Sequence, residues 1–291
     1  MRITSGVFTR NFLYNLESKT SRLMQLQDQL SSGRRITRPS EDPTGTVTMM
    51  RLSTAMAEME QYMRNIDDAR GWLEQAETAF LNTVETLHRS MQLVVQGTND
   101  TLGSGERYAI GAELEQLANH IWELANTKHG DNYLFSGYET RTQPFPVPHD
   151  YAGDDRQISR DIGPGLNLVV NFSGEDVFGG PEGVVNVMFE IAEQMKSNDV
   201  SQLDGSIERL QDNLDHLLTR TADLGGRIQR LDFVENRFQD SMVNMNQLQS
   251  RIADADLAEV MVQLRTEEAA YQAALSAGAR IMQTSLLDFI R

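Results

Sequence analysis

The stretch of sequence that decides the fold covers residues 52–94 and reads LSTAMAEMEQYMRNIDDARGWLEQAETAFLNTVETLHRSMQLV. Apolar side chains recur in it at alternating steps of four and three residues, and only Arg70 and Glu77 interrupt the pattern. A spacing that averages about 3.5 residues places these side chains along one side of a single helix without proline. At about 1.5 Å per residue, this helix is expected to be roughly 65 Å long. Such a stripe is stable only when it is buried, so an equally long partner is expected.

The expected partner is a second stretch, residues 203–252, which follows the same four-three spacing. Its exceptions are Thr221, Glu235 and Gln249. A shorter apolar stripe between Ile110 and Leu124 predicts a third helix, which we expect to end near Gly130 because glycine is a common helix cap. The sequence therefore predicts a mainly α fold, an elongated rod of long antiparallel helices that pack as a coiled-coil-like bundle.

The distribution of proline predicts a different kind of structure in the middle of the chain. All seven prolines lie within residues 39–43 or 144–181. Short runs between residues 132 and 183 are separated by turn dipeptides, and the run 166–172 alternates with β-branched and aromatic residues. We expect a small β-rich insert that leans on the helix ends near residues 97–105 and 184–195. Its expected anchors are Tyr133, Phe135 and Phe145, and deletion of residues 140–180 is expected to leave the terminal assembly helices intact.

The two ends of the chain form separate helices in this prediction. A narrow stripe from Phe12 to Leu30 stops in a segment rich in Gly, Pro and Ser, and the stripe of the second long helix changes phase between Ile252 and Leu257. A phase change indicates a hinge or a different partner. The expected regions are an N-terminal helix and hinge loop (1–45), a first helical arm (46–131), the β-rich insert (132–183), a second arm (184–251) and a C-terminal helix (252–291).

Composition excludes several classes of function. The formal net charge of -16 and the isoelectric point near 4.7 argue against nucleic-acid binding, which requires a basic surface. The chain has no cysteine, so a disulfide framework and a thiol nucleophile are excluded. We see no run of roughly 20 apolar residues that would span a membrane, and no ordinary secretory signal at the N-terminus. The protein is therefore expected to be cytoplasmic, or to leave the cell by a route that recognises another signal.

One pair of residues raises an enzyme as a remote alternative. Glu85 and His88 have the Glu-x-x-His spacing that di-iron helical bundles use. That site needs a second copy of the motif and two further glutamates, and no other histidine has a glutamate three residues before it. We therefore expect no catalytic, cofactor-binding or metal site, and a metal-binding helical-bundle enzyme stays a remote alternative.

Three segments carry a resemblance to a known family. Leu30–Gly33, with Arg35-Ile36 and Glu41-Asp42-Pro43, resembles the N-terminal signature of the flagellin family, with Glu41 at a position where aspartate is usual. Residues 252–259 resemble the family's C-terminal opening, and the middle of the chain, from residues 132–137 to 173–178, resembles its hook-associated branch. The resemblance spans both helical arms.

The resemblance implies a structural protein of the bacterial flagellum rather than an enzyme. It implies an extracellular protein that is exported through the flagellar export channel without a cleaved signal peptide. The implied role is a hook-filament junction adaptor, a ring of subunits between a preceding hook-associated protein and the flagellin filament. An export chaperone and the export apparatus are implied as further partners, whereas nucleic acid, membrane and cofactors are not. A flagellin filament subunit is the alternative.

The assembly interface is expected on the two terminal helices. Their stripes are thin and contain polar residues, so they bury too little apolar area to be ordered without neighbours. The basic cluster Arg34, Arg35 and Arg38 could meet an acidic surface of a neighbouring subunit, and a solvated loop is the alternative. The predicted interface residues are Leu16, Leu23, Leu26, Leu30, Arg34, Arg35, Arg38, Leu257, Met261, Leu264, Tyr271, Leu275, Met282 and Phe289.

Overall fold

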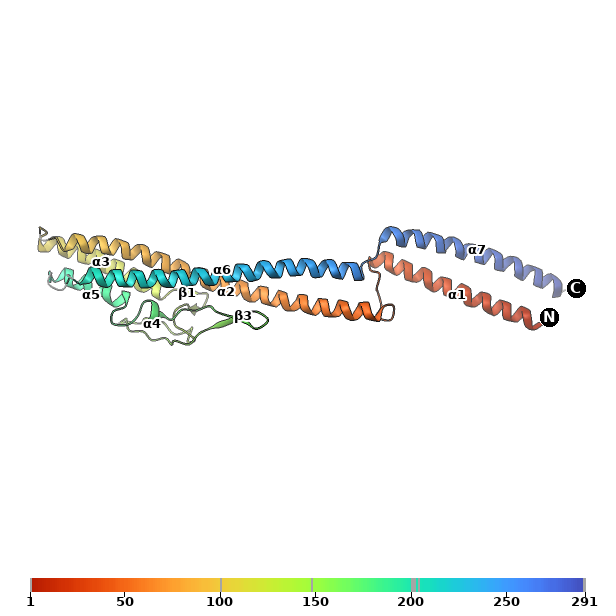
Figure 1. The fold of residues 1–291 in the computed structure, drawn as a ribbon, viewed down its shortest axis with the longest axis horizontal. Coiled ribbons are helices and arrows are strands. Elements are labelled where there is room, and N and C mark those ends of the chain that lie inside the picture. Colours follow the sequence, from red (N-terminus) through yellow and green to blue (C-terminus); the bar gives the residue numbers. More distant parts are fainter. Residues whose placement is uncertain (1, 100, 148, 200–202, 204, 290–291) are drawn as a thin grey trace. The chain divides into compact units, whose positions relative to one another are not determined.

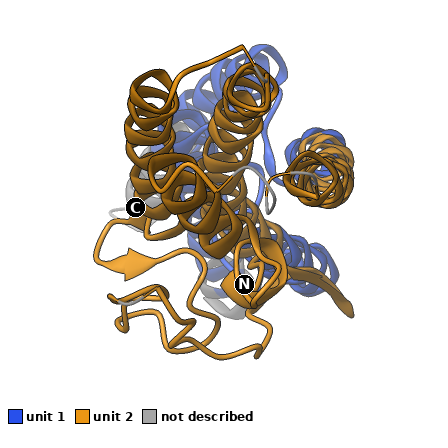
Figure 2. Cartoon of the chain, turned by 90° about the vertical axis from the view of Figure 1, so that its left-hand side faces the viewer, with its two compact units in different colours: residues 1–58, 240–291 blue, residues 59–239 orange. Residues whose placement is uncertain are grey.

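The computed structural model describes residues 2–99, 101–147, 149–199, 203 and 205–289. The chain forms two compact units: unit 1 combines residues 1–58 with 240–291, and unit 2 covers residues 59–239 (Figure 2). The elements, labelled in Figure 1, are α1 (Arg2–Ser32), α2 (Pro43–Gly97), α3 (Ser104–Ala125), β1 (Lys128–His129), β2 (Asn132–Tyr133), β3 (Ser159–Gly163), β4 (Leu166–Val169), α4 (Gly174–Val177), α5 (Val184–Lys196), α6 (Ser206–Ala253) and α7 (Leu257–Phe289).

The mainly α fold with a small β-rich part is confirmed. Helices make up most of the described chain, and its strands form two antiparallel pairs, β1 with β2 and β3 with β4. His129 pairs with Asn132 in the first hairpin, and Ser159 pairs with Val169 in the second. Among the described residues, we find no helix that is both long and apolar enough to cross a membrane.

The apolar stripes of α2 and α6 form the core of unit 2. Leu73, Phe80 and Leu87 of α2 are fully buried, as are Leu224 and Leu231 of α6. The two helices run antiparallel, because Tyr62 stacks on Phe238 at 5.8 Å between ring centroids, while Arg70 contacts the earlier residue Asp232. The predicted pairing of the two long stripes is therefore confirmed in this unit.

Two of the polar exceptions in the stripes contact each other. The Arg70 guanidinium donates hydrogen bonds to Glu235 and, at 2.8 Å, to Asp232 Oδ1. The side chains of Arg70 and Glu235 are only 26% and 21% exposed. A charge at a stripe position is thus matched by an opposite charge on the facing helix.

The third helix is shorter than the sequence pattern indicates, and the prediction that it ends near Gly130 is wrong. It ends at Ala125, where the Asn126 side chain donates to Trp122 O at 2.9 Å and accepts from Phe145 N at 3.0 Å. Residues 128–133 form the β1–β2 hairpin instead, with Gly130 in its turn. The helix stops because Asn126 binds the distant loop around Phe145, a contact that periodicity does not encode.

The insert shares the core of unit 2, which corrects the expected anchoring. Phe135, Phe145 and Phe178 are fully buried, and Phe135 stacks on Phe80 with ring centroids 5.7 Å apart. The insert thus packs on the middle of α2 instead of residues 97–105. Its expected contact with residues 184–195 is present, because His149 stacks on Phe189 with ring centroids 4.2 Å apart, while Tyr133 is only half-buried. Residues 140–180 include Phe172 and Phe178, whose ring centroids lie 5.4 and 6.2 Å from that of Phe80, so their removal is expected to destabilise unit 2.

Candidate assembly interface

A short segment links α1 to α2 and pairs with the segment that links α6 to α7, all within unit 1. Gly33 has a φ of 69°, and its N–H donates to Gln29 O at 2.9 Å, which caps α1. Beyond it, Arg35 N donates to Ala253 O at 2.6 Å, and Ala255 N donates to Gly33 O at 3.0 Å. Both hinges predicted from the sequence therefore lie next to each other and are joined by backbone hydrogen bonds.

The helices that follow the two hinges start at aspartate caps. Asp42 Oδ1 accepts from Gly45 N at 2.8 Å, and Pro43 occupies the first helical position, where its missing N–H costs nothing. Asp256 Oδ1 accepts from Ala258 N at 3.0 Å at the start of α7. These caps give a physical reason for the aspartates in both sequence signatures.

Glu41 holds the first hinge in a fixed conformation. Its carboxylate accepts hydrogen bonds from the backbone N–H of Thr37 at 2.9 Å and of Arg38 at 3.1 Å. The backbone N–H of Thr37 is the main cause that lowers the pKa of Glu41. The hinge is therefore a folded loop and not a flexible linker.

The helices α1 and α7 pack side by side in unit 1 (Figure 1). Lys19 Nζ lies 3.1 Å from Glu267 Oε2. A Cβ atom on Gly278 would lie 2.3 Å from Phe12 Cζ, so the ring of Phe12 packs directly on the backbone of α7. Lys19 and Gly278, a charged residue and a glycine in otherwise apolar stripes, thus both contribute to the contact between α1 and α7.

Unit 1 exposes much of its apolar surface. Only four of its described apolar residues are buried, namely Leu26, Ile36, Ala253 and Val260, whereas unit 2 holds the rest of the core. Exposed large apolar side chains that gather on one surface mark interaction sites in soluble proteins, which makes unit 1 the candidate for such a site. The exposed large apolar residues of unit 1 are Val7, Leu13, Tyr14, Met24, Val47, Met50, Val243, Leu248, Leu257, Met261, Val262 and Leu275.

Family comparison matches both helical ends of the chain. The bacterial flagellin N-terminal helical region matches residues 3–140, and the bacterial flagellin C-terminal helical region matches residues 207–290. The chain belongs to the flagellin family. The matched flagellin regions contain both hinges, both aspartate caps and the α1–α7 pair.

Individual flagellin relatives align over the whole chain. Flagellar hook-associated protein 3 of Salmonella typhimurium is 23% identical, and the alignment covers 100% of both proteins. A flagellin of Bacillus subtilis is 24% identical with the same coverage. The solved flagellar junction protein FlgL of Legionella pneumophila has a TM-score of 0.61 at 16% identity and covers 71% of this chain and 99% of its own. This last similarity establishes the shared fold.

The predicted interface leucines and methionines differ in exposure. Leu257, Met261 and Leu275 are 48%, 53% and 43% exposed. Half-buried positions are Leu16, Leu23, Leu30, Leu264 and Tyr271. The inclusion of Leu26 was wrong, because Leu26 is fully buried inside unit 1 and offers no surface to a neighbour. Met282 and Phe289 lie in α7, but their side chains are outside the described part of the chain.

The three predicted interface arginines have different surroundings. Arg35 donates to Ile252 O at 2.8 Å and to Asp42 Oδ2 at 3.4 Å, so it ties the two hinges together. Arg38 lies 3.7 Å from Asp28 Oδ2 with a side chain that is 72% exposed, and Arg34 is also exposed. Arg35 therefore has an intrachain role. Its side chain is 52% exposed, and its contact with a neighbouring subunit stays a prediction.

Sequence reasoning missed part of the exposed apolar surface. The exposed fractions of Val7, Leu13, Tyr14, Met24 and Val262 are 51% to 72%, yet these residues lie outside the four-three stripes of the terminal helices. Their signal is the presence of large apolar residues on the polar side of an amphipathic helix.

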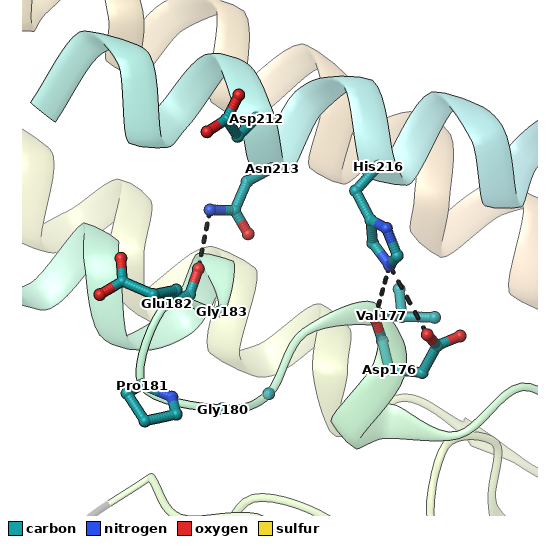
Figure 3. A pocket seen from close by; sticks show the side chains of 10 residues that line it. Asp176, Val177, Gly180, Pro181, Glu182, Gly183, Asp212, Asn213 and His216 are labelled. Atoms are coloured by element: carbon teal, nitrogen blue, oxygen red, sulfur yellow. Dashed lines mark hydrogen bonds and ion pairs between the residues drawn. The ribbon is translucent and has the colours of Figure 1, made fainter.

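A hollow lies on the surface of unit 2, and polar side chains of α6 bind the loop that borders it (Figure 3). It has a volume of about 390 Å³ between α6 and the α4–α5 loop. His216 Nε2 lies 2.7 Å from Asp176 O, and Asn213 Nδ2 donates to Glu182 O at 2.9 Å. These contacts fasten the loop to α6.

Glu85 and His88, the pair with the spacing of a di-iron site, are both exposed. No group of three metal-ligating side chains occurs within the described residues.

Proposed function

We propose that this chain is a structural subunit of the bacterial flagellum that joins the hook to the filament. In this role it assembles as a ring between a preceding hook-associated protein and the flagellin filament. It leaves the cell through the flagellar export channel without a cleaved signal peptide, with the help of an export chaperone. The observation that carries the proposal is the exposed apolar surface of unit 1 on a chain of the flagellin family.

The physical argument is that this surface needs neighbours. Met261 and Val262 of α7 are 53% and 68% exposed, and Met24 and Tyr14 of α1 are 59% and 72% exposed. Burying apolar area contributes about 25 cal/mol per Å², so contacts of this kind between subunits favour assembly. The full-length alignment with a relative named flagellar hook-associated protein 3 supports the junction position.

The test is the location of the protein on the flagellum. The source strain lacking its own copy is complemented with the tagged wild-type chain, and the tag is located by immunogold electron microscopy. We expect a single labelled site between hook and filament. Label along the whole filament would favour the alternative, a filament subunit, which the alignment with a flagellin of Bacillus subtilis makes reasonable. Absence of label from the flagellum would overturn both assignments.

Point variants test the role of unit 1. Met261→Asp and Leu275→Asp place a carboxylate at positions exposed in the single chain, so we expect unit 2 to unfold at the same temperature as in the wild type. Docking on the hook should fail, because a buried unpaired carboxylate costs several kcal/mol. Val147→Asp is the matched control, since Val147 is 75% exposed but lies in unit 2. Normal docking of both unit 1 variants would contradict the assigned surface.

A further inference from the structure

The outward face of α6 in unit 2 carries an exposed aromatic ring between two arginines. Phe233 is 69% exposed, and Arg230 and Arg237 are also exposed. Arg220 and Arg227 on the same helix form ion pairs with Asp176 and Asp223. Within the described part of the chain, neither Arg230 nor Arg237 forms one. We call Arg230, Phe233 and Arg237 the basic patch.

The outward face of α2 in unit 2 is mainly acidic, with one exposed basic residue, Arg64, between Glu60 and Asp67. Glu60, Asp67, Glu74 and Glu85 lie on the side of the helix opposite to its buried stripe, and all four are exposed. Asp68, next to them, pairs with Arg160 at 2.7 Å, but the four carboxylates have no ion-pair partner among the described residues. Leu81, 53% exposed, lies between them. We call Glu60, Asp67, Glu74, Leu81 and Glu85 the acidic row.

The two surfaces match in spacing as well as in charge. Arg230 and Arg237 are seven residues apart, and so are Asp67 and Glu74; each separation corresponds to about 10.5 Å along a helix. Each surface points away from the core that α2 and α6 share, so within one chain they face different directions. Within the chain, Arg237 lies over the Phe238 ring at 5.5 Å, and both surfaces are otherwise open to solvent, so each is free to contact another subunit.

We propose that the basic patch of one subunit docks on the acidic row of the next subunit. This inference rests on the proposed assembly of the chain into a ring. A contact between two different surfaces of the same chain is head-to-tail, and repeated head-to-tail contacts close into a ring when the rotation allows it. The ring of Phe233 supplies the desolvated centre of the contact, and Leu81 supplies an apolar partner. The charged pairs fix the orientation.

The experiment reverses the charges on each surface separately and then on both. Arg230→Glu with Arg237→Glu, Asp67→Arg with Glu74→Arg, and the variant with all four changes are produced as full-length chains in the complemented strain. The number of copies on isolated hooks is measured by quantitative immunoblotting, together with the amount exported and the unfolding temperature of each purified protein. Arg141→Glu is the control, because Arg141 is exposed and belongs to neither surface.

Each double reversal should reduce the copies per hook about tenfold or more, which corresponds to about 1.4 kcal/mol per contact. The fourfold variant should recover most of this loss, because it exchanges the two charges and keeps their complementarity. Wild-type levels in either double reversal would overturn the proposal. Loss without recovery in the fourfold variant would also overturn it, since the two surfaces would then not face each other. The location of the wild-type label decides the proposed function independently of these results.

Because a reversal could also disturb folding, a cross-linking test accompanies it. The chain has no cysteine, so Gln229→Cys beside the basic patch and Thr78→Cys beside the acidic row introduce the only two thiols. A short bifunctional thiol reagent should link assembled subunits of this double variant into a ladder of multimers. Single-cysteine variants should give no ladder beyond the dimer. A double variant that assembles on hooks without forming a ladder would contradict the proposal.

Discussion

At the scale of single residues, the most informative feature is the ion pair between Arg70 and Glu235 in the seam of unit 2. Both side chains are about three-quarters buried, and Arg70 also bonds Asp232. A partly buried pair of this kind contributes little net stability compared with apolar residues, but removing one partner leaves the other charge desolvated. The pair thus favours one alignment of α2 against α6 over slipped alignments.

Arg70→Met should therefore destabilise unit 2 by about 1–3 kcal/mol, whereas Arg70→Met combined with Glu235→Met should lie within about 1 kcal/mol of the wild type. Urea unfolding monitored by circular dichroism measures both values. Arg89→Met serves as the control, because the Arg89–Glu113 pair is 52% and 45% exposed and should contribute less than about 1 kcal/mol. The account of the pair would be refuted if the double variant lost as much unfolding free energy as Arg70→Met and Glu235→Met lose together.

Glu41 gives a pH-dependent prediction at the same scale. Its pKa is lowered from 4.5 by the backbone N–H of Thr37, so its hydrogen bonds stabilise the hinge above that pH and are lost as pH falls through the lowered pKa. The protection factors of the Thr37 and Arg38 amides, which are corrected for the intrinsic pH dependence of exchange, should fall in this acidic range. The variant Glu41→Gln, which does not titrate, should show no such step. An equal pH response in both proteins would rule out Glu41 as its cause.

At the scale of elements, the packing of α3 on α5 depends on one small residue. A Cβ atom at Gly111 would lie 2.9 Å from both Ala192 O and Lys196 N, so the two helix backbones are closer than any side chain allows. Helix α5 brings its own apolar residues, among them Met188 and Ile191, into the same core. The crossing of these two helices is thus set by the absence of a side chain.

Gly111→Ala should lower the unfolding free energy by about 1–3 kcal/mol, because overpacking against the backbone outweighs the better helix propensity of alanine. Gly225→Ala in α6 is the matched control, since a Cβ atom there meets nothing within 4 Å. That change should stabilise the protein by about 0.5–1 kcal/mol. Urea unfolding measures the change in unfolding free energy for both variants. Equal changes for the two substitutions would contradict the close approach of α3 and α5 at Gly111.

At the scale of the whole molecule, stability is concentrated in unit 2, which is continuous in sequence from Met59 to Gln239. Nearly all the buried apolar residues described belong to it. A fragment of residues 59–239 should therefore fold alone, with an unfolding midpoint within about 5 °C of the full chain, a shift that corresponds to about 1–2 kcal/mol. Thermal unfolding by circular dichroism provides the measurement. A fragment without a cooperative transition would show that unit 1 is needed for the core.

Limited proteolysis of the full chain is the companion experiment. Early cleavage should fall in unit 1, where few side chains are buried and local opening costs little free energy. If residues 2–32 and 257–279 of the dilute protein resisted the protease as well as unit 2 does, this view of unit 1 would be contradicted. The positions of the first cuts, read by mass spectrometry, separate the two outcomes.

The sequence by itself determined the features that arise from neighbours along the chain. The four-three spacing in residues 52–94 and 203–252 predicts two long helices, and the phase change between Ile252 and Leu257 predicts the hinge, because helical periodicity is a local property. The segment rich in Gly, Pro and Ser after Leu30 likewise predicts the end of the first helix, because these residues disfavour helix through local backbone preferences.

Only the tertiary structure decided which distant residues meet. It placed Arg70 against Glu235, buried Leu26, turned Arg35 toward Ile252 and ended the third helix at Ala125 through the loop that carries Phe145. None of these outcomes follows from periodicity, because each depends on side chains that are brought together by segments far apart in sequence. The same reason explains why the insert packs on the middle of α2: the stacking of Phe135 on Phe80 is a contact between two separate elements.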